Sequence, residues 1–183
     1  MAAAPLSLKA RALQWLAQRE HSRVELRRKL LRLARQRAAD VAAVRAADPA
    51  DDMGDRVSEG GSASGPTDEV ETLLDWLVAQ RYLSDTRFVE SRVNARAARY
   101  GNLRIRQELG QHGAAIDAAT AERLKDNELA RALAVWARKY GGEPASQANE
   151  RARQMRFLAG RGFSADVIRR VVRGGNSAAD ERA

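Results

Sequence analysis

Arginine clusters are the groups in this chain whose type and spacing point most directly to chemistry. A guanidinium group keeps its charge at every physiological pH and donates paired hydrogen bonds to a phosphate or a carboxylate. Comparable clusters return along the chain, over residues 23–37, 92–106 and 151–173. We interpret this recurrence as a binding surface for an anionic partner such as a nucleic-acid backbone, a helical filament or an acidic protein groove.

The candidate binding residues are basic side chains that lie within these clusters. Arg28, Arg32 and Arg35, for example, follow the i, i+4, i+7 spacing of one helix face. The clusters have none of the signatures of base-specific readout, such as a zinc finger or a basic zipper. The candidates are Arg27, Arg28, Lys29, Arg32, Arg92, Arg96, Arg104, Arg106, Arg161, Arg169 and Arg170.

The sequence lacks catalytic signatures. It has two histidines, His21 and His112, and both fall at turns between helices, where we expect surface or capping roles. The glycines at positions 60, 61 and 65 lack the preceding strand and the Gly-Lys-Ser/Thr ending of a phosphate-binding loop. The absence of cysteine excludes disulfides and thiol chemistry. We therefore predict no enzyme activity, no metal site and no cofactor.

The charge of the chain is unevenly distributed. The formal net charge is +8 over 183 residues. Residues 46–71 hold eight acids against one base, a net charge of −7, so the rest of the chain carries +15 and attracts polyanions. Two other interpretations stay open. In the first, the arginines only solvate helix faces and bind no partner. In the second, the acids of residues 46–71 hold a metal ion in an unusual nuclease, although ligands on a loop are poorly preorganised.

Helical periodicity accounts for most of the sequence. Charged residues make up 31% of the chain and aromatic residues 5%, which favours helices over strands. Capping side chains mark several starts, with Ser22 opening the second helix, Thr67 or Asp68 the third, and Ser84 or Asp85 the fourth. The apolar pattern of the second helix decays from about residue 38. The other expected helices span residues 8–19, 67–81, 85–99, 103–111, 115–124, 128–140, 147–160 and 164–173.

An internal repeat relates the two ends of the chain. Residues 12–30 return as residues 154–172, so that Leu16 aligns with Leu158 and Ser22 with Ser164. A short helix-turn-helix unit cannot bury a core alone and must stack on its neighbours. This pattern predicts an all-α fold with nine helices in three groups of three. The tryptophans and phenylalanines lie among aliphatic residues, so we expect them in the core and not on a base-stacking surface.

Four segments are distinctive when taken in order: ALQWLAQREHSRVELRRKL at 12–30, RYLSDTRFVESRV at 81–93, GNLRIRQELGQHG at 101–113 and RFLAGRGFSADVI at 156–168. Together they resemble the RecX regulatory proteins, bacterial modulators of the recombinase RecA. The central segment has Arg81 and Ser84 where the family usually has a glycine and an acid. The resemblance implies that the scaffold residues are Tyr82, Leu83, Asp85, Phe88, Gly101, Leu109, Gly113 and Phe157.

The resemblance also implies an architecture. Three tandem three-helix repeats would stack into an elongated, curved body. We expect these repeats at residues 7–81, 82–125 and 126–173, followed by a flexible tail at 174–183. Residues of about 46–67, rich in acids, glycine and serine, form a disordered insertion within the first repeat.

In function, the resemblance implies a regulator that binds the RecA filament on single-stranded DNA. It would inhibit the ATPase, strand-exchange and co-protease activities of RecA and so modulate DNA repair and the SOS response. Single-stranded DNA is a weaker partner, or one reached through the filament. No stretch is long enough to cross a bilayer, so we expect a cytoplasmic monomer without membrane contact. The alternative is a sequence-independent nucleic-acid-binding helical module that acts without RecA.

Overall fold

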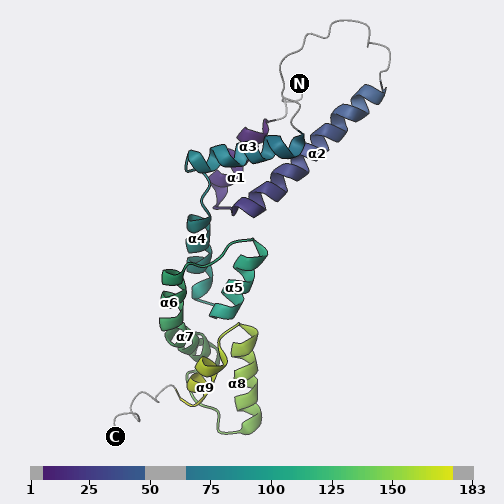
Figure 1. The fold of residues 1–183 in the computed structure, drawn as a ribbon. Helices are drawn as coiled ribbons and strands as arrows, with labels where there is room; N and C mark the ends of the chain where they lie inside the picture. Colours follow the sequence, from purple (N-terminus) through teal and green to yellow (C-terminus); the bar gives the residue numbers. More distant parts are fainter. Residues whose placement is uncertain (1–5, 48–64, 175–183) are drawn as a thin grey trace, which may run out of the picture. The chain divides into compact units, whose positions relative to one another are not determined.

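The computed structural model describes residues 6–47 and 65–174 (Figure 1). Within these ranges it contains nine helices and no strand, which confirms the all-α prediction. Residues 48–64 of the predicted acidic insertion and 175–183 of the predicted tail lie outside the described residues. The ends of the predicted insertion are helical, because α2 runs to Ala47 and α3 begins at Pro66. The chain divides into two compact units, residues 1–88 and 89–183. The three-repeat boundaries given above stay a prediction.

The first unit is built from three helices and the first turn of a fourth. These are α1 (Leu8–Gln18), α2 (Arg23–Ala47), α3 (Pro66–Ala79) and the start of α4 (Asp85–Ala97). Leucines and valines at helical spacing meet in one apolar core, as the periodicity predicts. The fully buried members of that core include Leu26, Leu30, Val70, Leu74 and Leu77.

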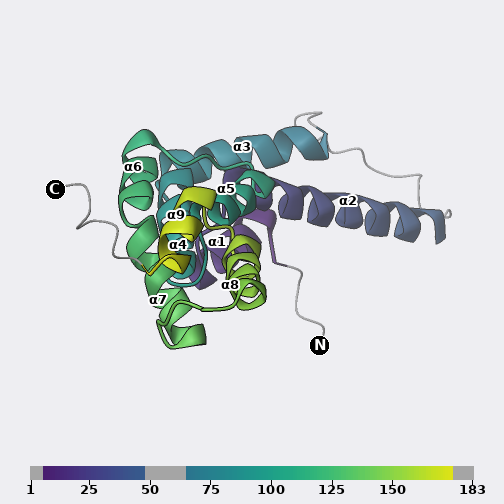
Figure 2. The same ribbon diagram turned by 90° about the horizontal axis from the view of Figure 1, so that it is seen from below.

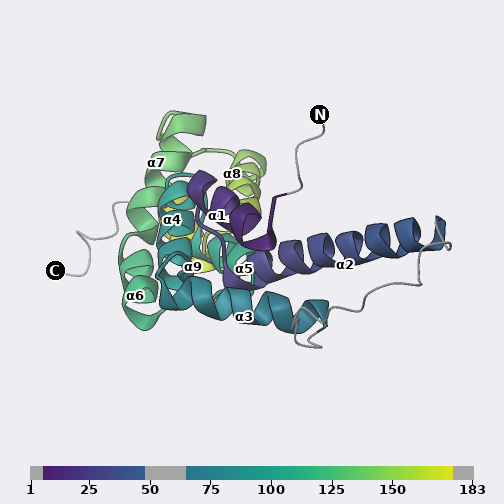
Figure 3. The ribbon, with the colours of Figure 1, turned by 90° about the horizontal axis from the view of Figure 1, so that it is seen from above.

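Helix α2 is longer than its apolar pattern predicts. It begins as expected, because the Ser22 hydroxyl accepts a hydrogen bond from the Glu25 backbone N–H at 3.1 Å. It then continues to Ala47, and its last part extends beyond α3 when the structure is seen from below and from above (Figures 2 and 3). Val41 and Val44 are 53% and 70% exposed in this part. Alanine has the highest helix propensity, so the alanine-rich end stays helical without a buried face.

The third helix starts earlier than the capping residues predict. We expected Thr67 or Asp68 at its N-cap, but Gly65 is the N-cap and Pro66 occupies the first turn. Proline suits this position because it lacks an N–H that would have no partner there. The fourth helix starts as predicted, with the Ser84 hydroxyl accepting a hydrogen bond from the Arg87 N–H at 3.3 Å.

The second unit contains the rest of α4 and five further helices. These are α5 (Asn102–Gln111), α6 (Ala118–Asp126), α7 (Glu128–Tyr140), α8 (Ala148–Gly160) and α9 (Ala165–Val172). Helix α6 begins three residues later than expected, because Asp117 caps it by accepting from the Thr120 N–H at 2.8 Å. Leu158, Phe163 and Val171 lie at the centre of the core formed by α7, α8 and α9.

Two glycines in the second unit bring separate segments into backbone contact. The Gly101 N–H donates to the Arg161 carbonyl at 2.9 Å, and the Leu103 N–H donates to the Gly162 carbonyl at 3.0 Å. A Cβ atom on Gly101 would overlap the Gly162 carbonyl group. Gly101 has a φ of −79° and is the N-cap of α5. Close approach, not a left-handed turn, requires glycine here.

None of the helices in the described ranges has both the length and the apolar character needed to cross a membrane.

Candidate anion-binding surfaces

One face of α2 forms an exposed basic groove, which we call the α2 groove. Arg27, Arg28, Arg32 and Arg35 line a space of about 480 Å³ together with Val24 and Leu31. Arg28, Arg32 and Arg35 are exposed, and no carboxylate pairs with them in the described part of the chain. The predicted i, i+4, i+7 series therefore presents unneutralised guanidinium groups beside a small apolar strip.

Two other candidates on α2 already have acidic partners. Arg27 donates to Glu71 of α3, and this hydrogen bond lowers the pKa of the Glu71 carboxyl. Lys29 lies 3.8 Å from Glu25, with its ammonium group 5.3 Å from the centre of the Trp15 ring. These two side chains help to hold α2 against its neighbours and offer less free charge to a partner.

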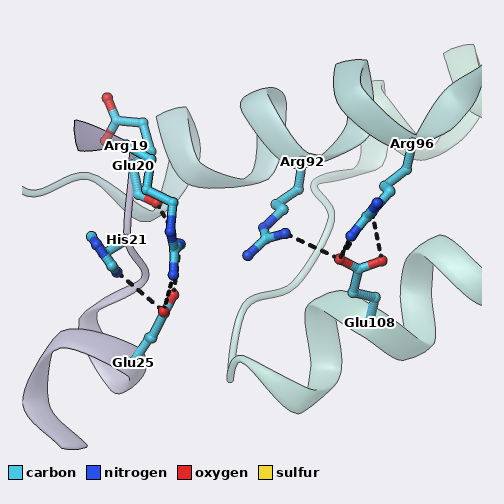
Figure 4. Close-up of polar contacts among 7 residues, drawn as sticks. All are labelled: Arg19, Glu20, His21, Glu25, Arg92, Arg96 and Glu108. Atoms are coloured by element: carbon cyan, nitrogen blue, oxygen red, sulfur yellow. Dashed lines mark hydrogen bonds and ion pairs between the residues drawn. The ribbon is translucent and has the colours of Figure 1, made fainter. Parts of the chain in front are cut away.

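The buried His21 and the half-buried Glu25 form a polar cluster at the start of α2 (Figure 4). His21 is 2% exposed, so the expectation of a surface role is wrong. Its Nδ1 lies 3.2 Å from a Glu25 oxygen, and Arg19 donates to the same carboxylate. Burial lowers the pKa of His21, and Glu25 opposes this effect only in part, so the imidazole is neutral at pH 7.

Glu25 stays charged in this setting. Burial raises the pKa of its carboxyl, but the hydrogen bond from Arg19 and the charges of its basic neighbours outweigh that effect. The net result is a pKa of about 2. Glu25 therefore links Arg19 and His21, in the turn between α1 and α2, to the first turn of α2.

In the second unit, Arg92 and Arg96 share one acidic partner on α5 (Figure 4). Arg92 donates to Glu108 at 3.2 Å, and Arg96 donates to both oxygens of the same carboxylate at 3.0 and 3.1 Å. The pair that we expected to face a partner thus links α4 to α5. One negative charge against two positive charges still leaves this site basic.

The remaining candidates are exposed to different degrees. Arg104 and Arg106 are exposed on α5, and the Arg104 guanidinium lies 4.8 Å from the Tyr100 ring. Arg161 lies 4.5 Å from the Phe157 ring and is half-buried. On α9, Arg169 pairs with Asp166, whereas no carboxylate partner is found for the exposed Arg170 among the described residues.

The scaffold residues of the first unit pack in the core, cap a helix or stack on an aromatic ring. Leu83 and Phe88 are buried at 2% and 0% exposure. Asp85 accepts a hydrogen bond from the Arg23 backbone N–H at 2.8 Å, so an acid at the start of α4 caps α2. Tyr82 is half exposed and stacks on Trp76 with 5.8 Å between ring centres.

The scaffold residues of the second unit serve packing and turns. Leu109 is buried, and Gly113 follows α5 with a φ of 66°, a conformation that favours glycine. Phe157 is half-buried and meets Tyr140 edge-on at 5.4 Å. Gly101 makes the close approach to Gly162 described above.

A buried polar network in the second unit was missed by sequence reasoning. Glu128, at the start of α7, is 4% exposed. It accepts hydrogen bonds from the Asn102 N–H at 3.0 Å, the Ser164 hydroxyl at 3.0 Å and the Ser164 N–H at 3.3 Å. One carboxylate thus caps the first turns of both α5 and α9. Nothing in the sequence near Glu128 distinguishes it from a surface acid at a helix start.

Arg131 completes this network one turn along α7. It donates to the carbonyls of Tyr100 and Leu124 at 2.9 Å each, and to the Asn102 side chain. Asn102 in turn donates to the Leu124 carbonyl at 3.1 Å. Burial lowers the pKa of Arg131, and the nearby Glu128 charge opposes that effect. The network joins the ends of α4 and α6 to the starts of α5 and α7.

The charge on these surfaces suits anions better than metal ions. No group of three or more His, Asp or Glu side chains in residues 6–47 and 65–174 is placed to hold a metal ion. The unpaired guanidinium groups lie on both units, at the α2 groove, on α5 and on α9. Their chemistry suits phosphate or carboxylate groups of a large partner.

Comparison with protein families identifies two of the helical segments. Residues 84–122 match the family model described as RecX, second three-helix domain. Residues 126–172 match the model described as RecX, third three-helix domain.

Comparison with curated proteins finds relatives over nearly the whole chain. The regulatory protein RecX of Ralstonia nicotianae is 44% identical over 179 residues, which cover 97% of this chain and 93% of the relative. The regulatory protein RecX of Herminiimonas arsenicoxydans is 45% identical over 175 residues, covering 94% and 95%.

A solved structure shares the fold. The crystal structure of RecX from Lactobacillus salivarius superposes with a TM-score of 0.57 at 18% sequence identity. The match covers 91% of this chain and 92% of that one.

Proposed function

The chain belongs to the RecX family of regulatory proteins, and from that premise we propose that it binds the RecA filament on single-stranded DNA and inhibits it. The inhibited activities are ATP hydrolysis, strand exchange and co-protease activity. Through them the protein modulates DNA repair and the SOS response. It acts in the cytoplasm as a monomer, by binding and without an enzymatic activity or a cofactor of its own.

The α2 groove is the observation that supports this proposal best. Three exposed guanidinium groups without acidic partners line one side of a single helix, beside the apolar Val24 and Leu31. A filament of protein on nucleic acid presents both carboxylates and phosphates at regular intervals, and guanidinium groups bind either. The apolar strip adds a surface that suits protein better than bare phosphate backbone.

The paired and unpaired candidates take different parts in this proposal. Contacts to the filament come from residues whose charge is free, and the paired residues hold those contacts in place. The first set is Arg28, Arg32, Arg104, Arg106, Arg161 and Arg170. The second set is Arg27, Lys29, Arg92, Arg96 and Arg169.

A plain nucleic-acid-binding module remains the alternative function. The same basic faces would then bind any single strand, and RecA would be irrelevant to affinity. Such binding depends only on phosphate neutralisation, so it falls steeply with salt and shows no preference for filament over bare DNA.

The test of the proposal is RecA ATPase activity on single-stranded DNA with increasing amounts of the chain. We expect substoichiometric wild-type protein to lower turnover. The double variant Arg28→Glu, Arg32→Glu should need at least about tenfold more protein for half-inhibition, because reversed charges at an interface repel what they formerly attracted. Helicity should stay unchanged, since both side chains are exposed.

The matched control reverses two charges on α1 of the same unit, Lys9→Glu and Arg11→Glu. Lys9 lies over the Trp76 ring at 3.7 Å and Arg11 donates to Gln14 at 3.0 Å, so neither lines the α2 groove. Half-inhibition by this control should stay within about threefold of wild type. Unchanged RecA turnover with folded wild-type protein would move the assignment to the plain binding module.

A further inference from the structure

A second basic cavity lies in the second unit, between the end of α4, α7 and the C-terminal part of α8. Its volume is about 390 Å³. Pockets that hold small ligands span roughly 300 to 1,000 Å³, so this one has room for a group the size of a nucleotide. Of its lining residues, Arg161 is predicted from the sequence as a candidate binding residue and Phe157 as a scaffold residue.

The polar lining of this cavity is cationic. Arg99, Arg138, Lys139 and Arg161 line it, and no acidic side chain does. None of the four has a carboxylate partner in the described part of the chain. The Nε of Arg161 is shielded from solvent and has no hydrogen-bond partner there, so one donor at the wall is unmet. Four unneutralised cations around one cavity attract an anion strongly.

The rest of the lining is aromatic and aliphatic. Tyr100 and Phe157 contribute rings, and Val135 contributes an apolar side chain. The Arg161 guanidinium lies 4.5 Å from the centre of the Phe157 ring, so a flat cation already packs on one ring at the wall. The Tyr100 ring in turn lies 4.8 Å from the Arg104 guanidinium. A purely anionic ligand such as a free carboxylate would make no use of the apolar part of this lining, whereas a base would extend the packing of flat groups.

We propose that this cavity holds one nucleotide of a single-stranded nucleic acid, with the phosphate among the four cations and the base against the aromatic side. Single-strand binding sites combine these two features, because every base has a flat face that stacks and every link carries a charge. An acidic peptide would satisfy the cations but brings little flat apolar surface. The cavity reads no sequence, since its lining offers mainly charge and ring faces.

This inference rests on the proposed function only in naming the strand inside the filament as the source of the nucleotide. Its test uses the full chain without RecA, so it can fail while filament inhibition holds. The probe is a labelled oligothymidylate of about 15 nucleotides, followed by fluorescence anisotropy at fixed salt.

The decisive variant reverses two exposed charges of the cavity, Arg138→Glu and Lys139→Glu. We expect its dissociation constant for the oligothymidylate to rise at least about tenfold. The control Arg151→Glu, Arg156→Glu makes the same change in net charge on α8, at exposed residues outside the cavity. That control should lose no more than about threefold. The neutral pair Arg138→Ala, Lys139→Ala should lose affinity to an intermediate degree, which covers the case in which the reversed variant folds poorly.

A strand of equal length without bases tests the aromatic half of the proposal. We expect wild-type protein to bind this abasic strand at least about fivefold more weakly than the oligothymidylate. Equal binding of the two strands, or equal losses in the cavity variant and its control, would overturn the proposal. So would a cavity variant that loses a glutamate-rich peptide but keeps the oligothymidylate, because the occupant would then be an acidic protein segment.

Discussion

Replacing Gly101 with alanine should unfold or severely loosen the second unit. The added Cβ would overlap the carbonyl group of Gly162 and the backbone of Phe163, and backbone atoms cannot rotate away. Relief requires the segments to separate, which breaks the hydrogen bonds Gly101 N–H to Arg161 and Leu103 N–H to Gly162. We expect a loss of about 4 kcal/mol or more in the free energy of unfolding, measured by urea titration of the purified chain.

Gly110→Ala is the matched control for this substitution. Gly110 lies within α5, and a Cβ there would meet no atom within 4 Å. Alanine is a better helix former, so this variant should gain about 0.5 to 1 kcal/mol. If Gly101→Ala keeps wild-type stability, the close approach of the two glycines is not present in solution.

The second large effect is expected from Glu128→Ala. Glu128 is 4% exposed, and its removal leaves two backbone N–H groups and one hydroxyl without their acceptor. It also leaves the half-buried Arg131 without its nearby negative charge. Each unmet buried donor costs about 1 to 3 kcal/mol. We expect a total loss of about 3 to 5 kcal/mol and a melting temperature lowered by roughly 15 °C or more.

Two further variants separate this network from an ordinary surface effect. Glu122→Ala removes an exposed acid of α6 that pairs with the exposed Lys125, and should change stability by less than about 0.5 kcal/mol. Glu128→Gln keeps one carbonyl acceptor and should lose less than the alanine variant. Equal stability of Glu128→Ala and Glu122→Ala would contradict the described network.

Periodicity predicted most of the fold because buried leucines and capping residues leave a direct mark on the sequence. The α7 boundaries match the expected ones, and Ser22 and Ser84 cap α2 and α4 as expected. The misses occur where local rules compete. Pro66 opens α3 ahead of Thr67, and Asp117 delays the start of α6. The high helix propensity of alanine lets α2 continue far beyond its last buried residue.

The sequence predicted which basic residues form the surfaces, but not which of them pair with acidic side chains. Spacing correctly put Arg28, Arg32 and Arg35 on one face, because helix geometry alone decides that. Spacing could not reveal that Arg92 and Arg96 meet Glu108, because that pairing depends on how α4 packs on α5. Tertiary packing likewise creates the roles of Gly101 and Glu128. Gly101 approaches Gly162, 61 positions further along the chain, and Glu128 joins Asn102, 26 positions earlier, to Ser164, 36 positions later.

The most direct test of the central claim compares two targets for the wild-type chain at one salt concentration. One target is a RecA filament assembled on a single strand with a nucleotide that RecA does not hydrolyse, and the other is the same strand alone. If the protein is a filament regulator, it should bind the filament at least about tenfold more tightly than the bare strand. Equal affinity for both, or tighter binding to the bare strand, would contradict the account.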